Sequence, residues 1–172
     1  ALIAACVQVS MALQRPTPVA VISTVLPGTM EREVVPRVSP ERFQLVYNPS
    51  FVAMGTVVRD FLAPEFTLLG VDNAEAARTL AMFYATIHDR LVYQTSVRNS
   101  ELIKVAYNTF IGLKIVFANT LMEICHKTAC NVDDVMDALC LATQRLISPA
   151  YMMAGMGDGG GCHPRDNIAL SW

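Results

Sequence analysis

A glycine-rich segment near the end of the chain carries the clearest candidate for chemistry, Cys162. Five glycines fall between Gly155 and Gly161, and Pro164 and Asp166 follow the cysteine. Glycine at this density indicates a loop, and a loop can aim a thiol into a cleft more freely than a packed helix can. Such a thiol can act as a nucleophile. The alternative is a flexible glycine-rich tail that carries an inert cysteine.

Lys104 and Asn108 form a second candidate site, within an apolar segment that is expected to be helical. Because residues four apart lie on the same face of a helix, both should project from one stripe, which Gly112 continues without a side chain. This stripe would form a polar pocket floor, or Lys104 would lie at the solvent boundary with its stem packed. In the first case the lysine would favour the Cys162 thiolate and stabilise an oxyanion.

The elements that would position these residues begin in an α/β order and then become entirely helical. Apolar, β-branched runs predict strands at 19–25, 43–47 and 66–71, and the first should be fully buried as in a parallel sheet. Hydrophobic periodicity and capping residues predict helices at 1–14, 30–38, 74–88, 101–126 and 132–141. We therefore expect a Rossmann-like α/β domain over residues 1–93 and an all-α domain over residues 94–172.

The composition is unusually apolar, with 53% hydrophobic and 16% charged residues. Since the helix at 101–126 is apolar on most sides, a subunit interface is the expected place for this excess. Lys114 and Glu123 interrupt that helix and argue against a membrane span. The net charge of −2 and the lack of a basic cluster argue against a nucleic-acid partner.

The cysteines indicate a reducing compartment. The sequence has five of them, an odd number, mostly in apolar and helix-like surroundings, which does not fit a disulfide framework. Cys125 and His126 with Cys130 suggest zinc, but no second ligand pair follows at finger-like spacing, so we expect no metal site. The N-terminal run has no basic leader and no cleavage site typical of a signal peptide.

Several motifs, in this order along the chain, resemble the UDP-glucose/GDP-mannose dehydrogenase family. They are Ser23-Thr24-Val25 before Pro27-Gly28-Thr29; Gly55-Thr56 with Asp60-Phe61 and Pro64; Glu101 to Lys104 with Asn108; and Gly159 to Asp166. The first two resemble the second half of that family's NAD domain. The third is similar to the start of its long central helix, and the last to its catalytic-cysteine loop. The resemblance extends over essentially the whole chain.

The resemblance implies a four-electron oxidation of a UDP- or GDP-sugar alcohol to a uronate by two molecules of NAD. Cys162 would capture the aldehyde as a thiohemiacetal, which is oxidised to a thioester and hydrolysed. Lys104 and Asn108 would stabilise the oxyanions, while Asp166 and Thr24 would handle the hydrolytic water and its protons. The resemblance further implies a cytoplasmic homodimer formed through the central helix. The implied contacts are Ser23, Thr24 and Arg165 to the cofactor, and Lys104, Ser50, Phe51, Gly159 and Gly160 to the substrate.

The sequence departs from the family at two carboxylates. Ser50 stands where the family's Asn-Pro-Glu-Phe segment has its acid/base glutamate, and Met54 replaces a second glutamate. Losing a general base lowers a rate by about two to four orders of magnitude. No Gly-x-Gly-x-x-Gly turn occurs within residues 1–89, so we expect a fragment that is inactive alone.

Two other functions fit the sequence. The first is a non-catalytic dimerisation scaffold, consistent with the missing cofactor turn and with Ser50. The second is a dehydrogenase of the β-hydroxyacid or 6-phosphogluconate type, which resembles this chain in its lysine and asparagine but needs no cysteine.

Overall fold

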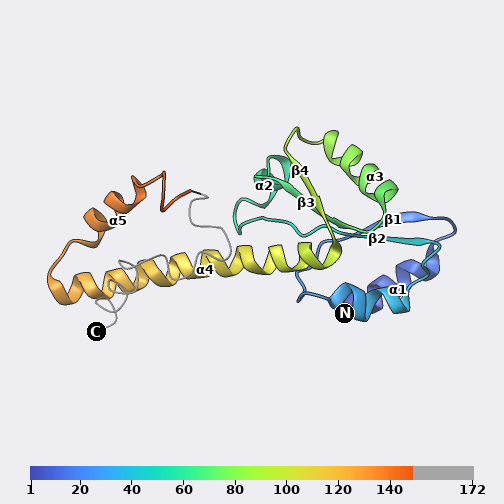
Figure 1. Cartoon of the computed structure of the whole chain (residues 1–172), viewed down its shortest axis with the longest axis horizontal. Helices are drawn as coiled ribbons and strands as arrows, with labels where there is room; N and C mark the ends of the chain where they lie inside the picture. Colours follow the sequence, from blue (N-terminus) through green and yellow to red (C-terminus); the bar gives the residue numbers. More distant parts are fainter. Residues whose placement is uncertain (149–172) are drawn as a thin grey trace. The chain divides into compact units, whose positions relative to one another are not determined.

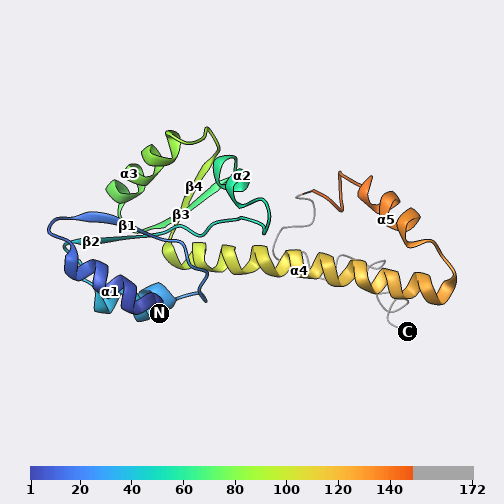
Figure 2. The same cartoon turned by 180° about the vertical axis from the view of Figure 1, so that it is seen from behind.

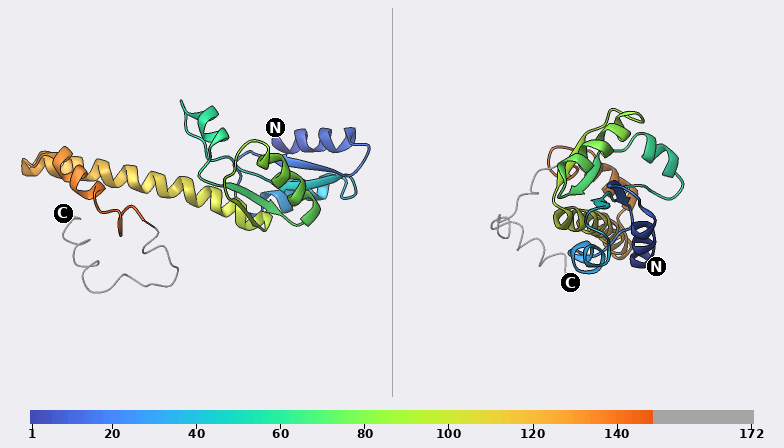
Figure 3. Two further views of the ribbon diagram at one scale, coloured as in Figure 1. Left: turned by 90° about the horizontal axis from the view of Figure 1, so that it is seen from above. Right: turned by 90° about the vertical axis from the view of Figure 1, so that its right-hand side faces the viewer.

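The computed structural model describes residues 1–148, so five predicted site residues, Gly159, Gly160, Cys162, Arg165 and Asp166, lie outside the described residues. The chain divides into two compact units, Ala1–Gly112 and Leu113–Trp172. The long helix α4 (Val97–Thr128) begins in the first unit and continues without a break into the second (Figures 2 and 3).

The first unit is built on one four-stranded sheet in the order β1-β2-β3-β4. Its strands are β1 (Thr17–Val21), β2 (Phe43–Tyr47), β3 (Thr67–Val71) and β4 (Val92–Thr95). The β1–β2 and β3–β4 pairs are parallel, whereas β2 and β3 are antiparallel, so the sheet is mixed. Helix α3 (Ala74–Ala85) lies on one face, and α1 (Leu2–Ala12) with the start of α4 lies on the other (Figure 1).

The expected α/β fold followed by a long helix is confirmed, and the strand predicted at 43–47 coincides with β2. The prediction for 19–25 is wrong in its bounds and its burial. The strand there, β1, spans Thr17–Val21 and only its last residue is buried. Its last pair joins Val21 to Tyr47, the last residue of β2, and the N–H of Asn48 then donates to the Val21 oxygen at 2.8 Å.

Strand β4 was not predicted. It has only four residues and lies at the edge of the sheet, where Tyr93 and Gln94 are exposed. A short edge strand needs no apolar alternation, and therefore the segment gives little sequence signal.

Side-chain caps set two helix starts that the sequence predicted. Asn73 Oδ1 accepts hydrogen bonds from the backbone N–H of Glu75 (2.9 Å) and of Ala76 (3.2 Å) at the start of α3. Asn131 Oδ1 accepts from the N–H of Asp133 (3.0 Å) at the start of α5 (Val132–Cys140). Such caps satisfy N–H groups that have no partner within the helix.

The remaining helices differ from expectation. Helix α4 begins before residue 101 because Ser96 caps it, its Oγ accepting from the N–H of Asn99 at 3.2 Å. The helix predicted at 30–38 is a π-helical turn, Met30–Val34, followed by a 3₁₀ turn, Val35–Arg37. The short α2 (Val57–Leu62) lies in the β2–β3 connection.

Two small cores cover the faces of the sheet. The larger joins Cys6 of α1 with Met30, Phe43, Tyr47 and Val97, and so packs the π-helical turn and the start of α4 against the strands. The other packs Val46 and Leu69 against Ala76 of α3. The first turns of α4 therefore belong to the core of the first unit.

In the second unit, α4 exposes large apolar side chains. Leu113, Ile115, Val116 and Phe117 are between 48% and 62% exposed. One 18-residue stretch of the helix has a mean hydropathy of 1.2, with none of it buried, so α4 is long and apolar enough to cross a membrane. Either a bilayer or another protein surface would cover such a helix.

We predict that Gly70→Ala destabilises the first unit. A Cβ at Gly70 would lie 1.8 Å from Ser100 Oγ and 3.0 Å from the Cα of Val97, so α4 would have to move away from β3. Overpacking of this kind lowers the free energy of unfolding by about 1–3 kcal/mol. Urea denaturation of the purified chain measures this change.

Gly112→Ala is the matched control, because a Cβ there meets no atom within 4 Å. Within a helix this change should raise stability by roughly 0.5–1 kcal/mol. Equal effects of the two substitutions would contradict the close contact between β3 and α4.

Candidate functional site

The fully buried carboxylate of Glu101 ties α4 to the loop that follows β1. It accepts hydrogen bonds from the backbone N–H groups of Gly28 and Met30, the second at 2.8 Å. Gly28 has a φ of +82°, a conformation that favours glycine. Because the same loop carries Ser23 and Thr24, Glu101 fixes two predicted site residues relative to the helix that carries Lys104.

Three site residues predicted from separate motifs line one pocket of about 610 Å³. Thr24 comes from the loop after β1, Ser50 from the segment after β2, and Lys104 from α4. The apolar side chains of α2 line the same pocket, with Ile22 and Val52. We call it the Thr24 pocket. Ser23 is exposed beside Thr24 and does not line it.

Lys104 is a buried cation, with only 7% of its surface exposed. Its Nζ donates to Asn108 Oδ1 at 3.2 Å and lies 4.9 Å from the centre of the Phe51 ring. Burial lowers the pKa of Lys104, because removal from water disfavours the charged amine. Within residues 1–148, no carboxylate forms an ion pair with Lys104.

A second pocket, of about 210 Å³, opens beside Lys104 and Asn108. Phe51, Tyr107 and Glu65 also line it. We call it the Phe51 pocket. Lys104 therefore lies buried between two pockets rather than at a solvent boundary, whereas Asn108 is exposed and lines only the Phe51 pocket.

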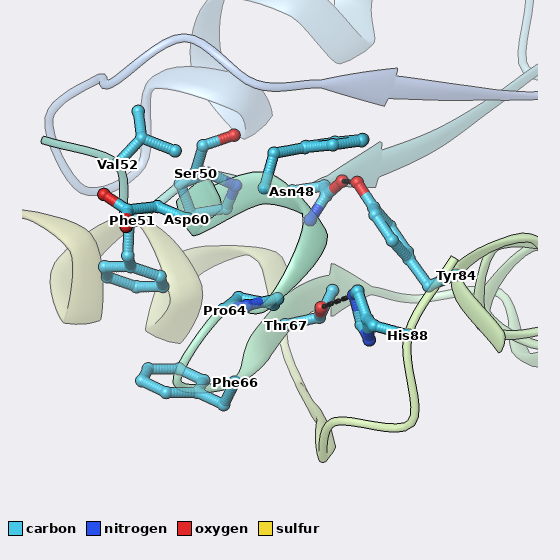
Figure 4. Close-up of a pocket in the computed structure, with 12 residues that line it drawn as sticks. Asn48, Ser50, Phe51, Val52, Asp60, Pro64, Phe66, Thr67, Tyr84 and His88 are labelled. Carbon is cyan, nitrogen blue, oxygen red and sulfur yellow. Dashed lines mark hydrogen bonds between the residues drawn. The ribbon is translucent and has the colours of Figure 1, made fainter. Parts of the chain in front are cut away.

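Two anchors hold the segment that carries Ser50 and Phe51. The first anchor is Asn48, a buried residue that precedes the segment in the chain. Its side chain donates to the backbone oxygen of Leu68 (2.9 Å) and accepts from the Tyr84 hydroxyl (2.5 Å). Figure 4 shows the Asn48 and Tyr84 side chains pointing toward each other, and His88 beside Thr67, with the His88 Nε2 atom 3.2 Å from the Thr67 hydroxyl.

The second anchor is Asp60, which follows the Ser50–Phe51 segment in the chain. Its carboxylate accepts from the Thr56 hydroxyl (2.6 Å) and the Ala53 N–H (3.0 Å). These bonds lower the pKa of Asp60, because they favour its ionised form. The bond from Thr56 has the largest effect. The carboxylate thereby holds the turn between Phe51 and α2, which borders both pockets.

Sequence reasoning missed three side chains: Glu101, which holds the loop after β1, and Tyr107 and Glu65, which line the Phe51 pocket. Glu101 offered one signal, because a carboxylate one turn before Lys104 on an apolar helix needs a buried partner. Tyr107 and Glu65 are 42 residues apart in the sequence, and no local pattern pairs them.

The part of the chain that the structure describes contains no group of three or more His, Cys, Asp or Glu side chains that could hold a metal ion. Four cysteines within it, Cys6, Cys125, Cys130 and Cys140, form no disulfide.

Comparison with known families gives two matches. The NAD binding domain of the UDP-glucose/GDP-mannose dehydrogenase family matches residues 1–88, and the central domain of the same family matches residues 98–172.

Individual relatives agree with these matches. The chain is 32% identical over 167 residues to a UDP-glucose 6-dehydrogenase of Rickettsia typhi, covering 95% of the chain and 38% of that protein. It is 31% identical over 177 residues to a GDP-mannose 6-dehydrogenase of Azotobacter vinelandii, covering 97% of the chain and 40% of that protein.

Solved structures show the same fold. A ternary complex of GDP-mannose dehydrogenase from Pseudomonas aeruginosa superposes with a TM-score of 0.88 at 28% identity, over 98% of this chain and 41% of that one. A UDP-glucose dehydrogenase from Pyrobaculum islandicum superposes with a TM-score of 0.76 at 31% identity, over 98% of this chain and 40% of that one. The chain thus spans about two fifths of the length of the relatives that it matches.

We predict that Glu101→Gln lowers the free energy of unfolding by about 2–3 kcal/mol, because the amide retains one acceptor oxygen and leaves one buried N–H unpaired. Chemical denaturation followed by circular dichroism measures the loss. Glu123→Gln, an exposed change on the same helix, should stay within about 0.5 kcal/mol. Equal stability of the two variants would show that Glu101 does not hold the Gly28–Met30 turn.

Proposed function

Because the chain belongs to the UDP-glucose/GDP-mannose dehydrogenase family, we propose that this protein oxidises the 6-hydroxyl of a UDP- or GDP-hexose to a uronate, with NAD as oxidant. One observation carries the proposal: Lys104, buried and hydrogen-bonded to Asn108, lines one pocket with Thr24 and Ser50. A buried ammonium group is suited to stabilise negative charge on a reacting oxygen.

The residues of the Thr24 pocket fit a dinucleotide at this position. Thr24 is exposed, and the apolar side chains of α2 offer a surface for a planar ring. We propose that Ser23, Thr24 and Arg165 contact NAD, which supplies the hydride acceptor. Lys104, Ser50, Phe51, Gly159 and Gly160 would contact the nucleotide sugar.

The chemistry would proceed through the thiol of Cys162. After the alcohol has lost a first hydride, the thiolate adds to the aldehyde carbon and forms a thiohemiacetal. Loss of a second hydride gives a thioester, so that four electrons leave the sugar. Water then attacks the thioester carbon and releases the uronate and the thiol. Lys104 and Asn108 would stabilise the two oxyanions, while Asp166 and Thr24 would orient the water and accept its proton.

Ser50 is the main departure from this scheme. It lines the Thr24 pocket where the family's glutamate would lie, and its hydroxyl is no base at neutral pH. Met54, at the second glutamate position, is 98% exposed. We therefore propose that the oxidation of the alcohol depends on another base and is slow.

For the helical part, we propose that residues 94–172 form the central domain and that α4 pairs with a second copy of the chain, while residues 1–93 belong to the NAD-binding domain. The exposed apolar side chains from Leu113 to Phe117 support this proposal. Charged Lys114 and Glu123 on the same helix favour a protein surface over a bilayer. We place the protein in the cytoplasm, consistent with the unpaired cysteines.

The catalytic proposal is tested by Lys104→Met and Cys162→Ser. We expect Lys104→Met to slow uronate formation by about 10²–10³-fold, because an oxyanion donor is lost. Cys162→Ser should abolish uronate formation. NADH absorbance and chromatographic detection of the uronate measure both reactions, and full turnover without the thiol would contradict the thioester route.

The alternative function is a dimerisation scaffold without activity, which the exposed apolar face of α4 favours. Calorimetric titration of the folded chain with NAD and with UDP-glucose distinguishes the two. If neither ligand gives a heat of binding, the result supports the scaffold.

The dimer is tested by Val116→Asp, a change at a residue of α4 that is 62% exposed. We expect a charge there to shift sedimentation from dimer to monomer, because a buried unpaired charge opposes association. Met82→Asp is the matched control, since Met82 is 65% exposed on α3. A dimer that survives Val116→Asp would place the interface elsewhere.

A further inference from the structure

Besides Asp60, which holds the turn before α2, the Phe51 pocket contains two polar side chains that the proposed chemistry does not use, Glu65 and Tyr107. Tyr107 precedes Asn108 on α4, whereas Glu65 lies in the loop between α2 and β3. The Tyr107 hydroxyl donates to Glu65 Oε2 at 3.2 Å. A carboxylate–phenol pair thus stands in the same pocket as the lysine–asparagine pair.

The pair is arranged to bind a ligand through Glu65. Burial, together with the negative charge of Glu65 and the hydrogen bond to it, raises the pKa of Tyr107, so the phenol stays protonated and donates. Glu65 is exposed, and within residues 1–148 no other side chain or N–H donates to it. The carboxylate therefore keeps acceptor capacity for a hydroxyl group.

The rest of the pocket suits a sugar ring. The Phe51 and Tyr107 rings lie 4.6 Å apart at 60°, and Phe51 also contacts Phe66, with ring centres 4.8 Å apart. These rings give an apolar wall against which the C–H face of a hexose can pack. Its volume of about 210 Å³ is sufficient for a hexose ring.

We propose that Glu65, oriented by Tyr107, is a specificity-determining residue that accepts a hydrogen bond from a hydroxyl of the hexose. The inference rests on the proposed function, because it takes the hexose of a nucleotide sugar as the ligand of the Phe51 pocket. The ring packs on Phe51, with Lys104 and Asn108 at one end of the sugar and Glu65 with Tyr107 at another. Tyr107 acts as a positioning residue.

Saturation-transfer NMR and titration with UDP-glucose and GDP-mannose test the inference, because the hexose and nucleotide protons of one ligand are observed separately. Titration with UDP and GDP isolates the contribution of the hexose. For Glu65→Gln we expect affinity for the nucleotide sugars to fall about tenfold or more, with weaker saturation of the hexose protons and unchanged binding of UDP and GDP.

Tyr107→Phe keeps the ring beside Phe51 and removes only the hydroxyl. Its effect on the same affinities should be smaller, roughly three- to tenfold. Glu75→Gln and Tyr93→Phe, exposed changes on α3 and β4, are the matched controls. The unfolding temperatures of all four variants should equal that of the unaltered chain. A merely structural role of Glu65 or Tyr107 would instead lower the unfolding temperature of its variant.

The outcomes separate this inference from the proposed function. If the unaltered chain shows no saturation of hexose protons, or if Glu65→Gln leaves the hexose contribution unchanged, the inference is overturned. If Glu65→Gln weakens hexose binding but no NADH or uronate forms with the unaltered chain, the sugar site stands and the oxidation does not.

Discussion

The buried carboxylate of Glu101 is the interaction on which the candidate site depends. It binds the backbone of the Gly28–Met30 turn and thereby docks the first turns of α4 against the loop after β1. Lys104 follows three residues later, a rise of about 4.5 Å along the helix. The register of one helix therefore sets the position of the Thr24 loop and of the lysine together, so a shift of α4 would displace both.

Local sequence patterns were enough to predict the fold class, strand β2 and the starts of α3 and α5, because each depends on periodicity or on neighbouring residues. The lysine–asparagine stripe was predicted for the same reason, since helical spacing alone places both on one face. Thr24 and Ser50 were assigned only through the family resemblance, and the structure brings both to a pocket with Lys104. The Tyr107–Glu65 pair could not be predicted, because it depends on how the β2–β3 connection folds over α4.

The environment of Lys104 combines two opposing effects. Burial disfavours its charge, while the Asn108 oxygen and the face of Phe51 stabilise it. A cation held away from water interacts more strongly with an oxyanion than an exposed lysine does, because the local dielectric is lower. The anchors at Asn48 and Asp60 contribute indirectly, since they hold the segment that brings Phe51 over the ammonium group.

The continuity of α4 gives its two halves different thermodynamic behaviour. The first half packs on the sheet, through a core cluster that includes Val97 and forms within a single chain. The second half exposes its apolar side chains in the single chain, so under the proposed pairing its burial is bimolecular and strengthens with protein concentration. In dilute solution one end of the same helix would remain packed while the other frays. The concentration of the protein in the cell would then determine how much of α4 is ordered.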